Sequence, residues 1–236
     1  MLSPPQSVWR RRLLLAPAAV MIALIARELL PFSRSRRDLQ AVLADRGHAW
    51  VAIRPDESAP AASVEFSGTR VDAELVEAIA EESVRKGRVA DNVGKVVCFG
   101  GSLTADGIDS LSRWPALTQL SLENVEPPAA PILHGFERLR EVKLQGMTLT
   151  QTFAAALASS PGLRTVRLDF VALERGALTA LCRGRGLGEL HLDEALMAPG
   201  ELSALSLASN LRVLTLAPRH GSPDNAASLS PLASLP

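Results

Sequence analysis

Leucine-type residues recur along the chain at an interval of about 24 residues, and this interval constrains the fold more than any other feature. The stretch LREVKLQGMTL, residues 139 to 149, shows the pattern, with polar side chains between its apolar positions. Those apolar positions are Leu139, Val142, Leu144, Met147 and Leu149. Equivalent stretches begin at Val93, Leu117, Leu139, Leu163, Leu187 and Leu211, spaced by 24, 22, 24, 24 and 24 residues. The spacing predicts repeated structural units, each containing a short β-strand.

A second set of leucines stands six residues before most of these positions. Its members are Leu111, Leu133, Leu157, Leu181 and Leu205. Three residues earlier still, most of the units carry another apolar residue: Ile108, Ala154, Leu178 and Leu202. A spacing of i, i+3 is typical of the buried face of a helix. Each unit is therefore predicted to contain a strand, a turn and a short helix that leads to the next strand.

The pattern resembles the leucine-rich repeat family, L-x-x-L-x-L-x-x-N/C-x-L, over about residues 90 to 235. The resemblance implies an α/β fold in which the units form a right-handed solenoid, or horseshoe arc, with the strands on its concave side. Two features depart from the family. EPPAAP, residues 126–131, predicts an extended segment or a loose turn where a helix would begin. The N/C position carries no asparagine, so no asparagine ladder can form; it holds Gly101, Val125, Met147, Val171 and Ala195.

The chain is predicted to have three parts: residues 1–37, residues 38–90, and a leucine-rich-repeat array of six repeats over residues 91–236. The second part is expected to cap the array with a helix closed by Gly47, a strand over AWVAIRP and an atypical half-repeat at residues 64–79. At the other end, Leu229 and Leu235 keep the register, but no polar cap follows. Two explanations stay open: a partner covers this edge, or the sequence is truncated.

The first part, residues 1–37, combines a basic cluster with an apolar run. Arginines at positions 10 to 12 precede the uncharged residues 13–26, and the run continues past Arg27 and Glu28 to Phe32. This favours an uncleaved hydrophobic helix that tethers the protein to a membrane through residues 13–32, because Leu24 is too large for the −3 position of a cut after Ala26. The early arginines favour a single-pass protein with its repeat domain on the non-cytoplasmic side. A cleaved signal, which would give a secreted protein, a buried soluble helix and an organellar targeting peptide remain alternatives.

Composition and motifs narrow the function. The formal net charge of zero gives no general attraction to nucleic acid. The excess of arginine over lysine favours a bacterial source. Cys98 and Cys182 lie in non-adjacent units without a nearby histidine, so neither a zinc site nor a disulfide is predicted. RGRGLG, residues 183–188, lacks the Lys-Ser/Thr of a phosphate loop, and no nucleophile elbow occurs. We therefore predict no enzymatic activity, cofactor, metal or small-molecule substrate.

The polar residues between the strand leucines are expected to stack in three columns on the concave face. The first column is Lys95, Gln119, Glu141, Thr165, Glu189 and Val213. The middle column is Val97, Ser121, Lys143, Arg167, His191 and Thr215. The third column is Phe99, Glu123, Gln145, Asp169, Asp193 and Ala217.

A cationic run in the middle column, flanked by acidic residues, is the candidate binding surface for a protein or peptide ligand. The candidate residues are Lys143, Arg167, His191, Glu123, Asp169, Asp193, Glu141 and Glu189. Arg167 is the best single anchor, because its planar guanidinium can hold a carboxylate through two hydrogen bonds. Alternatively, the opposite charges only offset one another and keep an exposed sheet soluble.

The predicted function is thus a non-enzymatic, membrane-tethered leucine-rich-repeat protein that presents a concave β-surface for protein-protein interaction. The alternative is a structural or assembly element, or a truncated fragment, whose open C-terminal edge packs against another chain.

Overall fold

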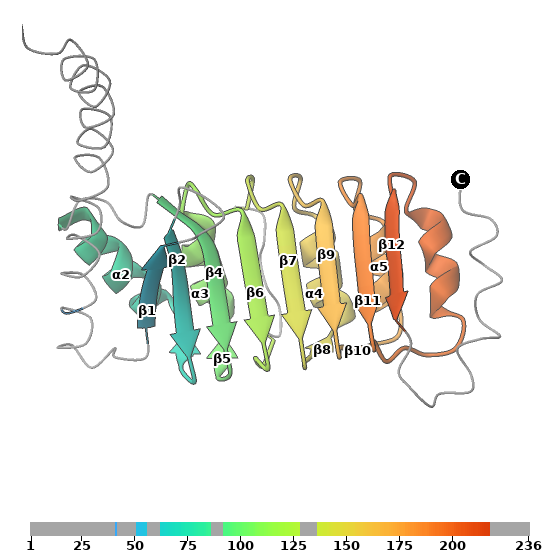
Figure 1. Cartoon of the computed structure of the whole chain (residues 1–236), viewed down its shortest axis with the longest axis horizontal. Helices are drawn as coiled ribbons and strands as arrows, with labels where there is room; N and C mark the ends of the chain where they lie inside the picture. Colours follow the sequence, from blue (N-terminus) through green and yellow to red (C-terminus); the bar gives the residue numbers. More distant parts are fainter. Residues whose placement is uncertain (1–40, 42–50, 56–61, 86–91, 128–135, 218–236) are drawn as a thin grey trace, which may run out of the picture.

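A computed structural model describes residues 41, 51–55, 62–85, 92–127 and 136–217. In these ranges the chain has a mixed α/β fold built on one mostly parallel, eight-stranded sheet, with no closed barrel. The strand order is β1-β2-β4-β6-β7-β9-β11-β12. The strands lie side by side along the long axis of the molecule, and the described helices cover one face of the sheet (Figure 1).

The strands of the sheet keep the register that the sequence interval predicts. They are β1 (Val51–Pro55), β2 (Ala62–Ser67), β4 (Val93–Phe99), β6 (Gln119–Glu123), β7 (Glu141–Gln145), β9 (Thr165–Asp169), β11 (Glu189–Asp193) and β12 (Val213–Ala217). β1 is antiparallel to β2, and every other neighbouring pair is parallel. From β4 to β12 the pairing runs without a slip, so that Arg167 lies opposite Lys143 on one side and His191 on the other. The predicted stacking of the polar residues in three columns is confirmed.

Alternate residues of each strand point into the core. The inward pairs of β4 to β11 are at most 2% exposed: Val96 and Cys98, Leu120 and Leu122, Val142 and Leu144, Val166 and Leu168, Leu190 and Leu192. Because side chains alternate between the two sides of a strand, the polar residues between these positions share the opposite face. We call that face, which no described helix covers, the open face.

The helices form a layer behind the sheet. They are α2 (Ala73–Arg85), α3 (Ala105–Ser112), α4 (Gln151–Ala158), α5 (Ala177–Cys182) and the 3₁₀ helix η2 (Glu201–Leu207). The helix positions predicted from the second leucine register are buried: Ile108, Leu111, Ala154, Leu157, Leu178, Leu181, Leu202 and Leu205.

The ends of these helices differ. The hydroxyls of Thr104 and Thr150 cap α3 and α4 by accepting N–H bonds from Gly107 and Phe153. α5 and η2 begin after Gly176 and Gly200 and have no side-chain cap. The uncapped seven-residue η2 takes the tighter 3₁₀ form, which suits short pieces.

A residue with positive φ follows each parallel strand from β2 to β11. These residues are Gly68, Gly100, Asn124, Gly146, Phe170 and Glu194, with φ between 49° and 66°. Each donates its backbone N–H to the carbonyl oxygen of the last residue in the next strand, at 2.7–3.0 Å. Short parallel bridges continue the turns where β3 (Arg70–Val71) meets β5 (Ser102–Leu103) and β8 (Thr148–Leu149) meets β10 (Ala172–Leu173). Backbone donors therefore build a regular turn ladder without the asparagine ladder.

Several predictions fall outside the described residues. They include the hydrophobic segment 13–32, the helix expected before Gly47 except for helical residue 41, and Leu133, Leu229 and Leu235. Of EPPAAP only residues 126–127 are described, and Glu126 forms a parallel bridge with Ser102. The described helices include none with the length and apolar character needed to cross a membrane.

Candidate functional site

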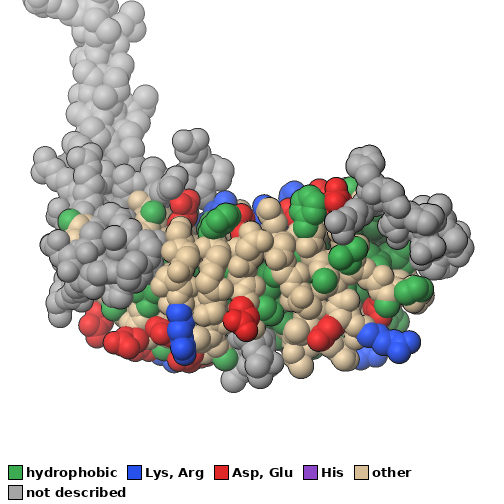
Figure 2. All heavy atoms as spheres, turned by 90° about the horizontal axis from the view of Figure 1, so that it is seen from below, with side chains coloured by type: hydrophobic (Ala, Val, Ile, Leu, Met, Phe, Trp, Pro, Cys, Tyr) green, Lys and Arg blue, Asp and Glu red, His purple; other side chains and the backbone are tan. Residues whose placement is uncertain are grey.

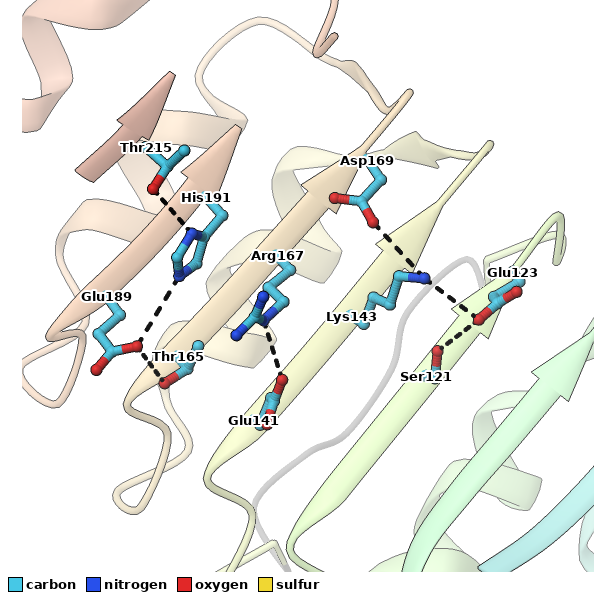
Figure 3. A network of polar contacts seen from close by, with 10 residues as sticks. All are labelled: Ser121, Glu123, Glu141, Lys143, Thr165, Arg167, Asp169, Glu189, His191 and Thr215. Carbon is cyan, nitrogen blue, oxygen red and sulfur yellow. Dashed lines mark hydrogen bonds and ion pairs between the residues drawn. The ribbon is translucent and has the colours of Figure 1, made fainter. Parts of the chain in front are cut away.

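The eight candidate binding residues lie on four consecutive strands, β6, β7, β9 and β11. All of them occupy outward positions, so the fold places them together on the open face. Their polar contacts fall into three groups that no hydrogen bond or ion pair between described residues links (Figure 3). The groups differ in how far their charges are already satisfied.

The first group surrounds Lys143 at the centre of β7. Its Nζ donates to Gln145 Oε1 at 2.7 Å and forms ion pairs with Glu123 Oε1 at 3.5 Å and Asp169 Oδ2 at 3.6 Å. Ser121 Oγ donates to the same Glu123 oxygen at 3.1 Å. An ammonium group has three donors, and here three acceptors surround it. Lys143 therefore joins three strands and keeps little capacity for a ligand.

The second group is the pair between Arg167 and Glu141. Arg167 Nε donates to Glu141 Oε1 at 3.1 Å, and the arginine side chain is 46% exposed. Its terminal nitrogens, Nη1 and Nη2, have no hydrogen-bond partner among the described residues. The outer edge of the guanidinium is thus free to take a carboxylate through two parallel hydrogen bonds.

The third group centres on His191 in β11. Its Nδ1 shares a hydrogen bond of 3.0 Å with Thr215 Oγ1. Its Nε2 lies 3.9 Å from Glu189 Oε2, which is too far for a hydrogen bond, and is buried without a hydrogen-bond partner in the described chain. Glu189 also accepts a 3.4 Å bond from Thr165. This group is less completely satisfied than the first.

Asp193 is the candidate residue that joins none of these groups. It lies opposite Asp169 in the register, but Asp169 is engaged by Lys143, whereas Asp193 is exposed and has no partner among the described residues. Within the described ranges, no cluster of three or more His, Cys, Asp or Glu could hold a metal ion.

Polar neighbours that were not among the eight candidates complete the contacts. Ser121, Gln145, Thr165 and Thr215 each bond to a candidate residue. The column pattern places all four on the open face, but hydrogen bonding between neighbouring columns depends on side-chain conformations that the spacing does not determine.

Phe170 was also missed at the sequence level. It follows Asp169 at the end of β9, is 55% exposed and has a φ of 55°. A bulky residue with positive φ is a conformational outlier. The backbone ladder imposes this conformation, because the Phe170 N–H donates to the Asp193 carbonyl at 2.8 Å. Phe99, at the end of β4, is 53% exposed.

One cavity lined by described residues lies away from the open face. It has a volume of about 260 Å³ and lies where the chain passes from the helix layer to β6 and β7. Its walls are Ser112, Trp114, Pro115, Leu117, Phe136, Glu137 and Arg138. The indole Nε1 of Trp114 is buried and has no hydrogen-bond partner in the described part of the chain.

The two cysteines are buried and free. Burial raises the pKa of each thiol to about 12. Both thiols are therefore protonated near neutral pH, and Cys98 packs in the core beneath β4.

The comparisons with known proteins identify no function for the chain. No protein-family model matches the chain, and a search of curated proteins finds no relative. The class that the fold defines is a mixed α/β protein with an open, mostly parallel sheet.

Proposed function

We propose that the chain is a leucine-rich-repeat solenoid that binds another protein on its open face, and that it acts by binding rather than by catalysis. The observation that carries this proposal is the outer edge of the Arg167 guanidinium on the open sheet face, which makes no hydrogen bond to any described residue. Neighbouring strands already hold most of the surrounding charges in place. A partner carboxylate would therefore meet a donor whose surroundings need little ordering.

The regular backbone supports the leucine-rich-repeat assignment. From β4 to β12, the strands, the buried leucines and the turn ladder all follow the same interval of 22 or 24 residues. In a solenoid each unit contacts only its neighbours, and stacking creates one continuous binding surface. The concave curvature expected for such a surface is part of this proposal.

Arg167→Gln tests the proposed site. Peptides selected from a random displayed library against the full chain should bind about tenfold to a hundredfold more weakly after this change, because a charge-assisted hydrogen bond contributes about 1.5–3 kcal/mol. Arg183→Gln, at an exposed position after α5, is the matched control. Binding that survives both Arg167→Gln and the bulky open-face change Thr165→Trp would refute the proposal.

Membrane attachment through residues 13–32 is a separate part of the proposal and rests on the sequence alone. The protein would be a single-pass anchored protein with the sheet on the non-cytoplasmic side. Protease added to intact cells should then degrade the region around the sheet. Protection from protease until the cells are lysed would contradict this orientation.

A second candidate function, assembly through β12, is favoured by a specific observation. Val213 is 41% exposed, and Leu211, Leu214 and Leu216 are only partly buried. Among the described strands, β12 pairs with β11 alone. Under this alternative, the wild-type chain self-associates, and the Val213→Lys variant should have a lower sedimentation coefficient than the wild type. A monomeric wild-type chain would rule out self-assembly.

A further inference from the structure

The open face is acidic although the chain as a whole is neutral. The outward positions of β2 to β12 carry three cations, Lys95, Lys143 and Arg167. The same positions carry six carboxylates: Glu65, Glu123, Glu141, Asp169, Glu189 and Asp193. With His191 counted as neutral, the net charge of these positions is −3, whereas the formal charge of the whole chain is zero. The face therefore attracts a partner of opposite charge.

Unpaired carboxylates lie at the end of β11. Lys143, with a single positive charge, forms ion pairs with both Glu123 and Asp169, and Arg167 pairs with Glu141. Asp193 and the following Glu194 have no ion-pair partner in the described part of the chain. A cation from a partner would therefore find carboxylates available for ion pairing at this end of the sheet.

Exposed apolar side chains flank these carboxylates. Phe170 and Glu194 occupy equivalent positions in adjacent turns, and Phe170 bonds through its backbone to Asp193. Leu196, two residues beyond Glu194, is half exposed. Figure 2 views the edge at which the parallel strands end, and hydrophobic side chains are exposed there beside acidic ones. We call Phe170, Asp193, Glu194 and Leu196 the β11 rim.

We propose that the β11 rim receives an arginine side chain from a net-basic segment of the protein partner. A guanidinium can pair with the carboxylate of Asp193 through two hydrogen bonds and stack on the face of Phe170. A lysine ammonium lacks the planar fork and gains less from such a site. The inference rests on the proposed use of the open face and names the chemistry of the segment that binds there.

The test uses twelve-residue peptides selected from a random displayed library against the full chain. The selected peptides are expected to be richer in arginine than in lysine, and to lose at least about tenfold in affinity with Asp193→Asn or Phe170→Gly. Glycine suits the second change because Gly68, Gly100 and Gly146 already occupy this turn position. The double change Glu81→Gln with Glu137→Gln, at exposed positions off the open face, is the control and should leave affinity within about twofold.

Each other outcome overturns the inference. Binders that depend on Arg167 but show no arginine enrichment and tolerate Asp193→Asn would leave the proposed function standing without the rim. Binders that tolerate Arg167→Gln, Thr165→Trp and Asp193→Asn would remove the proposed function as well. Equal losses in the control would indicate unspecific attraction to acidic protein. Dimerisation of the wild-type chain that Asp193→Asn abolishes would make a second copy the occupant.

Discussion

β7 and β12 carry the same sequence pattern but lie in different surroundings. β7 is flanked by β6 and β9, and its core residue Leu144 is 0% exposed. The equivalent Leu216 of β12, which has one described neighbour, is only partly buried. The difference shows that a leucine in this pattern is sealed by the units on both sides of it rather than by its own unit.

Polar side chains near β7 and near β12 also differ in how many of their donors and acceptors are paired. Lys143, in the middle of the sheet, has acceptors from three strands within 3.6 Å. His191, next to the last described strand, has one hydrogen-bonded nitrogen and one buried nitrogen without a hydrogen bond among the described residues. Because β11, like β7, has a strand on each side, this difference depends on the side chains that the neighbouring strands present and not on the number of strands.

The largest expected effect is the loss of stability when a core leucine is replaced by alanine, which should be greater in β7 than in β12. Leu144→Ala should lower the free energy of unfolding by about 2–5 kcal/mol, the usual cost of a cavity in a sealed core. Leu214→Ala should lower it by less than about 1.5 kcal/mol, because folding removes less of the apolar surface of this partly buried side chain from water. Urea unfolding followed by far-UV circular dichroism measures both. Equal losses would mean that β12 is as well sealed as β7.

The cysteines provide a second comparison, because Cys98 lies in β4 and Cys182 lies at the end of α5, nearer β12. Local opening costs least where few packed units must separate. In native buffer at pH 8, Cys182 should react with a thiol reagent about tenfold faster than Cys98. Cys98→Ser and Cys182→Ser assign the two phases.

The pH dependence of this reaction follows from burial. The pKa of each folded thiol is raised to about 12, whereas an unfolded thiol has a pKa of about 8.5. The stabilising effect of the neutral buried thiols is complete below about pH 8.5 and is lost as the pH rises toward 12. Modification of both thiols should accelerate over this range. A single fast phase at neutral pH would show that at least one thiol is accessible in the folded state.

The sequence predicts the columns of the open face well because both of its periods are geometric. The alternation of side chains along a strand determines which residues lie on the open face. The interval of 22 or 24 residues determines which residues of neighbouring strands stack on one another. The pairing of charges is different. Lys143 lies near carboxylates in both adjacent columns, and side-chain reach selects Glu123 and Asp169. Phe170 could not be identified as a turn residue with positive φ, because its residue type disfavours the conformation that the backbone ladder imposes.

A smaller effect is expected from removing the central cation. Lys143→Met leaves the carboxylates of Glu123 and Asp169 on neighbouring sides of an uncharged residue, and should cost about 1 kcal/mol, within the range of partly exposed ion pairs. His191→Gln should cost less than about 0.5 kcal/mol, because His191 makes one hydrogen bond to a side chain. The cost of Lys143→Met should shrink in 1 M salt, which screens the repulsion. A larger cost for His191→Gln would reverse the comparison of the two regions.

The smallest expected effect concerns the turn ladder, where Gly146 of the central region and Phe170 at the end of β9 occupy the same position. Phe170→Gly should change the free energy of unfolding by less than about 1 kcal/mol and in the stabilising direction. Relief of the unfavourable backbone conformation should stabilise the fold by about 1–2 kcal/mol. The greater freedom of glycine in the unfolded chain should offset about 0.5–1 kcal/mol of this stabilisation.

The matched change, Gly146→Ala, should destabilise the protein. Gly146 has a φ of +61°, and an added Cβ would collide with Asn124 Oδ1. Thermal unfolding of the two variants and the wild type shows whether each change stabilises or destabilises the protein. If Phe170→Gly instead costs more than about 1 kcal/mol, the aromatic ring contributes packing energy to the fold. Weaker peptide binding by that variant could then come from a damaged turn, and only Asp193→Asn would still test the β11 rim.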